Sequence, residues 1–174
     1  MKKLLLIIAL VLSSIGFSQA QEVEKGYAGF VDVGFTTNGS KWNTYVAEVF
    51  TTHGRQFNQH IFLGGGIGLQ QFIGKGSDLY SIGVPLYVDF RVNFIKHKIS
   101  PFFDLKHGVS IGPFGMFTNP TLGVRFGITD KLALNLHVGY TLQSAWGEVV
   151  NHPDTMEFNH FLLHGVNIRF GFEF

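Results

Sequence analysis

The sequence predicts an all-β fold, an eight-stranded antiparallel up-and-down transmembrane β-barrel, and three observations lead to this prediction. Residues 166–174 alternate without a break between large apolar and small or polar side chains, which is the period of a strand with two unlike faces. Seven further segments show the same period. The chain also has 22 glycines and 19 phenylalanines but only 14 % charged residues, where soluble domains have about 25 %.

We take the predicted strands in chain order. They are residues 27–35, 44–53, 60–70, 82–94, 101–111, 120–128, 132–142 and 162–174.

Turn-forming residues separate the first three predicted strands. In 27–35, valines and a phenylalanine alternate with small residues and Asp32. The turn sequence Asn38-Gly39-Ser40 then leads to 44–53, whose apolar face is the weakest of the set. In 60–70, isoleucines and leucines face one way and three glycines face the other.

The fourth and fifth segments predict a hairpin with a defined register. Pro85 near one end of 82–94 requires a bulge or a local opening, because proline cannot donate to the ladder. A two-residue turn at His97-Lys98 pairs 82–94 with 101–111 so that the numbers of opposed residues add to 195. This register opposes Asp89 to Lys106 and Arg91 to Asp104, and on the other face Phe90 to Leu105 and Val92 to Phe103. A shift by one residue mixes the faces, and a shift by two opposes like charges.

The last three segments complete an even number of strands. We expect a loop at 112–119 before 120–128, a tight turn at 129–131 before 132–142, and the longest loop at 144–159 before 162–174. Connections after the second, fourth and sixth strands are thus short, and the others are longer. Membrane barrels have this asymmetry between their two ends.

The polar face of the strands decides which face is outside. It consists mainly of glycine, serine, threonine and asparagine with sparse charges of both signs, whereas a solvated face needs long charged side chains. Eight strands enclose an interior just wide enough for side chains to fill, and small residues with mutually neutralising charges suit it. We therefore expect the apolar face outside, in lipid. A soluble barrel with the faces reversed is the less favoured alternative.

The expected inner face carries a set of opposite charges. We interpret it as a structural network inside a filled barrel, with a narrow gated pore as the less favoured interpretation. Its residues are Asp32, Glu48, Asp89, Arg91, Asp104, Lys106, Arg125, Arg169 and Glu173.

Both ends of the sequence indicate export. Lys2 and Lys3, a short apolar run to Leu12 and the sequence Ser18-Gln19-Ala20 are typical of a cleaved signal peptide. We therefore predict residues 1–20 as signal peptide and 21–174 as one barrel domain. Residues 1–20 hold two of the 13 lysines and arginines and none of the 12 acids, so the rest has a net charge of −1 and does not favour nucleic acid as a partner. The chain has no cysteine, which excludes disulfides and thiolate metal sites.

The closing alternation Phe170, Phe172 and Phe174 resembles the C-terminal signal of bacterial outer-membrane barrels. Four stretches, residues 62–68, 85–91, 122–126 and 169–174, make the whole segment similar to small barrels of the OmpA/OmpX-like size class, and more narrowly to Bacteroidetes-type outer-membrane barrels. The resemblance implies the outer membrane as location, its lipids as surroundings, and the barrel-assembly machinery as a partner during biogenesis. It assigns no chemistry.

Chemical candidates in the sequence are weak. His107 and Ser110 resemble the residue types of outer-membrane lipid A deacylases, but a separation of three places them on opposite faces of a strand. His152, Asp154, Glu157 and His160 match no metal motif, and we interpret them as a solvated loop. We therefore expect a non-enzymatic surface protein without cofactor or metal, whose loops bind a partner or ligand. A lipid-modifying enzyme and a narrow channel are the alternatives.

Overall fold

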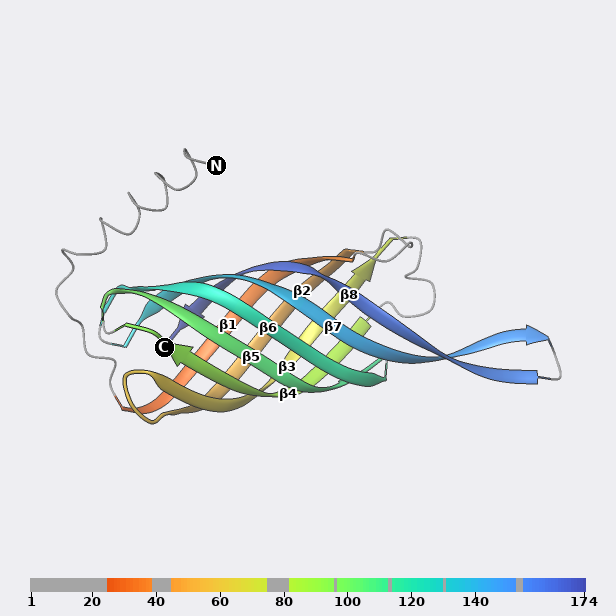
Figure 1. Ribbon diagram of the computed structural model, residues 1–174, viewed down its shortest axis with the longest axis horizontal. Coiled ribbons are helices and arrows are strands. Elements are labelled where there is room, and N and C mark those ends of the chain that lie inside the picture. Colours follow the sequence, from red (N-terminus) through yellow and green to blue (C-terminus); the bar gives the residue numbers. More distant parts are fainter. Residues whose placement is uncertain are drawn as a thin grey trace.

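The computed structural model is a closed barrel of eight strands in which each strand is antiparallel to the next and β8 returns to β1 (Figure 1). It describes residues 25–38, 45–74, 82–95, 97–112, 114–129, 131–152 and 155–174, with the backbone alone at 38, 145–152 and 155–161. The strands are β1 (Gly26–Asn38), β2 (Tyr45–Gln56), β3 (Ile61–Ile73), β4 (Ile82–Asn93), β5 (Ile99–Ile111), β6 (Gly115–Gly127), β7 (Ala133–His152) and β8 (Thr155–Glu173). The predicted signal peptide lies outside the described residues.

The barrel is closed by a continuous ladder between β1 and β8, from Phe30 opposite Glu173 to Asn38 opposite Gly165. A path from Gly26 through directly paired residues of β2 to β8 returns to β1 at Thr36, ten residues further along. Such a stagger requires strands that tilt from the barrel axis, typically by about 35–45°. The described residues contain no helix long and apolar enough to cross a lipid bilayer.

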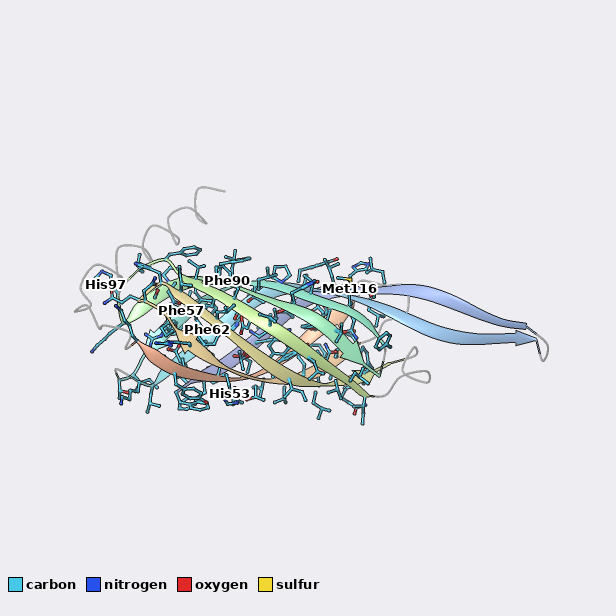
Figure 2. All side chains as sticks on the ribbon, turned by 90° about the horizontal axis from the view of Figure 1, so that it is seen from below. His53, Phe57, Phe62, Phe90, His97 and Met116 are labelled. Carbon is cyan, nitrogen blue, oxygen red and sulfur yellow. The ribbon has the colours of Figure 1, made fainter. Side chains whose placement is uncertain are left out.

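The two-residue period gives the barrel an apolar outer wall and a polar inner wall, as predicted. Leu136, Val88 and Ile168 are 48 %, 57 % and 58 % exposed on the outside. Their chain neighbours Asn135, Asp89 and Asn167 are completely buried on the inside. Side chains project from both walls along the whole barrel (Figure 2).

We call the end with the β2–β3, β4–β5 and β6–β7 connections the turn-side end and the opposite end the loop-side end. Figure 2 shows Phe57 and His97 toward the first and Met116 toward the second. The sequence predicts longer irregular loops at the loop-side end than at the turn-side end. This prediction is wrong at two of the four loop-side connections. The expected loop at 112–119 is shortened because β6 begins at Gly115, and strand fills most of the expected loop at 144–159.

The extra length at the loop-side end is a β-hairpin. β7 continues to His152 and β8 begins at Thr155, and their pairing runs beyond the rim of the barrel (Figure 1). The sequence predicts a loop at 144–159, whereas in the structure the backbone groups of most of these residues pair between β7 and β8. Of the four candidate ligands, His152, Glu157 and His160 lie on the strands of this hairpin without described side chains, and Asp154 lies outside the described residues.

The register predicted for the β4–β5 hairpin is confirmed. Asp89 is opposite Lys106, Arg91 is opposite Asp104, Phe90 is opposite Leu105, and Val92 is opposite Phe103. The predicted two-residue turn is wrong, because the ladder ends at Asn93 opposite Phe102. One further bond, from the Phe94 amide to the Pro101 carbonyl at 2.9 Å, extends the pairing toward a longer connection.

Pro85 is accommodated by a local opening, as expected. On the β5 side it is opposite Ser110 within a continuous ladder. On the β3 side the paired residues pass from Ile67 opposite Leu86 directly to Gln70 opposite Gly83. The register is unchanged across this gap, so the proline costs hydrogen bonds without displacing the faces of β3 and β4.

Inward-facing glycines make room for the large side chains of a narrow interior. A Cβ atom on Gly66 would lie 2.6 Å from the Tyr87 ring, and one on Gly68 would lie 2.5 Å from the Phe50 ring. In the same way Gly123 faces the Phe102 ring. The three glycines that follow one another at every second position of β3 thus belong to the packing of the interior.

Candidate functional site: the charged barrel interior

The structure places all nine residues of the expected charge network inside the barrel, each with at most 7 % of its surface exposed. They come from β1 (Asp32), β2 (Glu48), β4 (Asp89, Arg91), β5 (Asp104, Lys106), β6 (Arg125) and β8 (Arg169, Glu173).

Asp104 is the centre of the largest group. Its Oδ2 atom accepts hydrogen bonds from Arg91 Nη2 and from Lys106 Nζ, each at 2.9 Å. Arg91 Nε also donates to Oδ2, at 3.3 Å, and Lys106 Nζ also donates to Oδ1, at 3.1 Å. The confirmed register explains Arg91, which is directly opposite Asp104. Lys106 adds a second cation because residues two apart on a strand share a face.

Lys106 also joins strands that are distant in the sequence. Its ammonium lies 3.2 Å from Asp89 Oδ2 and 3.7 Å from Asp32 Oδ2. The other oxygen of Asp32 lies 3.4 Å from Nε2 of the fully buried His137 on β7. Side chains from β1, β4, β5 and β7 therefore meet at one height inside the barrel. They can contact one another across the lumen because the interior of an eight-stranded barrel is narrow.

Aromatic rings complete the coordination of the buried cations. The guanidinium carbon of Arg91 lies 4.0 Å from the centre of the Phe30 ring and 4.3 Å from the centre of the Phe102 ring. The guanidinium of Arg169 lies 4.4 Å from the Phe50 ring. Cation–π contacts of this kind are stronger where water is excluded. The sequence placed these phenylalanines on the inner face, but not their contacts with specific arginines.

Two further ion pairs lie toward the two ends. Arg125 Nε is 3.0 Å from both carboxylate oxygens of Glu173. Arg169 Nε donates to Glu48 Oε1 at 2.6 Å, and Nη1 donates to Asn119. Thr36 donates to the same Glu48 oxygen at 3.1 Å. Each ion pair joins two strands on either side of a third. Glu48 and Arg169 are both opposite Gly34 of β1, and β7 lies between the strands of Arg125 and Glu173.

This arrangement fills the lumen. Five carboxylates face four lysine or arginine side chains at distances of direct contact, and phenylalanines occupy the space between them. The geometry is that of a self-neutralising core, without a row of like charges that would attract one sign of ion. Among the described side chains, no group of three or more histidines and carboxylates is arranged to hold a metal ion.

A small hollow opens at the loop-side end of the interior. It has about 280 Å³ of empty space, part of it open to solvent, and its wall includes Thr36, Gln70, Phe72, Thr141 and Gln143. Gln70 Oε1 and Gln143 Nε2 are buried there without hydrogen-bond partners among the described residues. The hollow has room for a group about the size of a water molecule.

The candidate pair His107 and Ser110 is divided by the barrel wall. Ser110 is completely buried inside, whereas His107 is exposed outside. His107 Nδ1 instead lies 2.9 Å from Thr118 Oγ1 on β6. Two other outward histidines contact hydroxyls in the same way. The Tyr27 hydroxyl lies 2.6 Å from His53 Nδ1, and the Tyr140 hydroxyl lies 2.6 Å from His164 Nδ1. The sequence alone does not indicate these cross-strand pairs, because they depend on the register of the strands.

The residues of the expected assembly signal face outward in a row. Phe170, Phe172 and Phe174 are 51 %, 39 % and 40 % exposed. Phe174 exchanges two backbone hydrogen bonds with Gly29, at 2.7 and 2.9 Å, and its ring covers that glycine. This contact extends the β1–β8 closure to the turn-side end.

Comparisons with known proteins give a similar barrel but no family. No protein-family model matches the chain, and neither does any curated protein. A solved structure described as "De novo design of transmembrane beta-barrels" covers 88 % of this chain and 99 % of its own, with 16 % identity and a TM-score of 0.49. The likeness is one of fold. It says nothing about activity, ligands or partners.

Proposed function

We propose that the protein is a non-enzymatic integral membrane barrel of the bacterial outer membrane, whose interior is closed by its own side chains and whose loop-side end meets a partner or ligand. The observation that carries this proposal is the inverted polarity of the wall. Large apolar side chains predominate on the outside of the barrel, while the described carboxylates of the strands are all buried.

An apolar outer wall of this extent favours lipid as the surroundings. Large exposed apolar patches on soluble proteins mark interaction sites, and here such residues surround the entire barrel. Membrane barrels have an outward apolar band about 25 Å high with aromatic residues at its edges. Tyr27, Phe57 and Phe94 are more than half exposed at the turn-side end, as such an edge requires.

The filled interior favours a closed barrel over a channel. Arg91 and Lys106 contact carboxylates on the neighbouring strand, and Lys106 also reaches Asp32 on the far strand β1. No wide solute path fits within eight strands. The outer membrane as location rests on the signal sequence expected at residues 1–20 and on the barrel-assembly signal expected at Phe170, Phe172 and Phe174. Assembly machinery and outer-membrane lipids are then its partners.

The test begins with insertion. The purified chain without residues 1–20 is diluted from urea into phosphatidylcholine vesicles, and we expect flotation with the vesicles, protease protection and faster gel migration before boiling than after. A monomer that stays soluble without detergent or lipid would contradict the proposal.

Three further measurements address the finer statements. Fractionation of expressing bacteria should place the chain in the outer membrane, and deletion of Phe174 should reduce assembly there without stopping export. Planar-bilayer recordings should show no steady conductance. Mass spectrometry of lipid A from expressing cells should show no change. A conducting or lipid-modifying protein would replace the corresponding part of the proposal.

A further inference from the structure

One charged side chain is present on the described part of the outer wall. Among the outward-facing side chains that the structure describes on the eight strands, all are apolar or neutral polar groups or histidines except Arg55 of β2. The inner wall, in contrast, neutralises each of its cations with carboxylates. Arg55 has no ion pair or hydrogen bond with any described residue.

A guanidinium on the wall of a membrane protein that has no partner among the described residues needs an anion. Lysine and arginine are costly at the bilayer centre and inexpensive only near its surfaces, where they reach phosphate and water. Arg55 is the penultimate residue of β2, at the turn-side end. That position places its guanidinium at the level of the aromatic side chains Tyr27 and Phe57, which mark the edge of the apolar band.

The residues beside Arg55 form a rigid polar and aromatic corner. Tyr27 is directly opposite Arg55 in the β1–β2 ladder, so the two side chains begin about 5 Å apart on the same face. His53 holds the Tyr27 hydroxyl through Nδ1 at 2.6 Å, and its Nε2 lies 2.9 Å from Thr51 Oγ1. The Phe174 ring packs edge-on against His53. Figure 2 shows the His53 side chain on the outside of the barrel.

Next to this corner, a smooth strip of the outer wall runs toward the middle of the barrel. On the β3 side, Arg55 is opposite Leu63 and His53 is opposite Gly65. Gly65 faces outward, and a Cβ atom there would meet no atom closer than 3.5 Å. Arg55 at the edge matches the phosphodiester of a phospholipid. The apolar surface beside it, with its shallow depression at Gly65, matches an acyl chain.

We propose that Arg55, with the Tyr27 hydroxyl oriented by His53, binds the phosphodiester of a glycerophospholipid in the leaflet at the turn-side end of the barrel. Guanidinium groups bind phosphate oxygens with two parallel hydrogen bonds. The acyl chain of the same lipid lies against Leu63 and Gly65. This inference rests on the proposed function, because it requires the barrel to be in a bilayer.

The experiment titrates dimyristoylphosphatidylglycerol onto the folded full-length barrel in a nonionic detergent and counts bound lipids by native mass spectrometry. We expect one lipid to bind more tightly than the rest. Arg55→Gln should weaken that first binding about tenfold, and Arg55→Lys should weaken it less because it keeps the charge without the planar fork. Tyr27→Phe should have a smaller effect than Arg55→Gln.

Lys98→Gln is the matched control, since Lys98 is an exposed cation in the β4–β5 connection at the same end. It should leave the first binding unchanged. Equal losses for Lys98→Gln and Arg55→Gln would overturn the site in favour of general attraction between charges. Full competition by glycerol 3-phosphate at the lipid's own concentration would overturn the lipid assignment, because a free phosphate would then suffice.

Insertion separates this inference from the proposed function. Arg55→Gln should still insert into phosphatidylcholine vesicles and show the same heat-dependent gel migration as the parent. If both proteins insert but bind phosphatidylglycerol equally, the site is wrong and the membrane barrel stands. If the parent itself fails to insert, the proposed function fails.

Discussion

The inner and outer walls of this barrel consist of alternate residues of the same eight strands, yet different physical requirements decide which side chains fit each wall. On the inner wall each large group has particular partners, as Arg91 has Asp104, Phe30 and Phe102. On the outer wall Leu136, Val138 and Ile168 share only their apolar character and their exposure. Inside, identity matters because a missing partner cannot be replaced by water. Outside, lipid accepts any apolar side chain.

The largest expected effect is on the inner wall. Arg91→Ala should lower the free energy of unfolding by about 3–5 kcal/mol, because Lys106 is then left to neutralise the buried carboxylates of Asp104, Asp89 and Asp32. The measurement is a urea titration of the barrel in lipid vesicles, followed by tryptophan fluorescence. A loss below about 1 kcal/mol, the range of exposed ion pairs, would show that Lys106 suffices for these carboxylates.

The outer wall should respond to charge more than to identity. Leu136→Arg should cost about 2–4 kcal/mol, since it places a cation in the apolar band. Leu136→Ile should be almost neutral in the same titration. Asn135→Ser, on the inner face one residue away, should be tolerated better than Leu136→Arg. If Leu136→Arg and Asn135→Ser have equal free energies of unfolding, the wall that carries Leu136 does not face lipid.

Two adjacent glycines of β3 compare the walls directly. A Cβ on the inward Gly66 would meet the Thr51 carbonyl at 2.3 Å and the Tyr87 ring at 2.6 Å. Gly66→Ala should therefore cost about 1–3 kcal/mol through overpacking. A Cβ on the outward Gly65 would make an ordinary contact with the Tyr87 carbonyl oxygen at 3.5 Å. Gly65→Ala should therefore change stability by less than about 0.5 kcal/mol, as surface changes do. The opposite order would contradict the account of inner glycines as space for aromatic rings.

The smallest effect concerns a polar pair on the outer wall. A double-mutant cycle with His107→Val and Thr118→Val should give a coupling energy of about 0.6 kcal/mol, the average of hydrogen bonds within membranes. The cycle compares unfolding free energies of the parent, both single variants and the double variant. A coupling above about 2 kcal/mol would show that outer-wall pairs are as specific as those of the interior.

The sequence predicted the faces of the strands and one register well, for a physical reason. Polarity with period two is a local property, and the charges of Asp89, Arg91, Asp104 and Lys106 distinguish between registers that the apolar face alone leaves equivalent. The extra strand in β6, β7 and β8 was missed. Residues 112–119 and 144–159 contain glycine, proline and polar side chains, and in a membrane barrel strands continue beyond the apolar band.

Contacts across the lumen could not be read from the sequence. Lys106 reaches Asp32 across the lumen, so that contact depends on the registers of all the ladders between β5 and β1. Arg169 and Glu48 meet because both are opposite Gly34, which requires the registers of the two ladders of β1. Each hairpin can be argued from local charges, but an error of two residues in any of the eight pairings would move every cross-lumen partner. The sequence therefore indicated the members of the interior network but only the partners within one hairpin.

The seam between β1 and β8 sets the order of events in folding. Thr37 donates to the carbonyl of Val166, 129 residues away, at 3.2 Å, so this last ladder forms only when both ends of the domain are present. Until then the chain is an open sheet with two unpaired edges, and such edges recruit other strands. Closing a loop of this length also makes folding slow. The chain must therefore be kept from its own copies between synthesis and closure, and a catalyst that holds one edge while the other arrives shortens that interval.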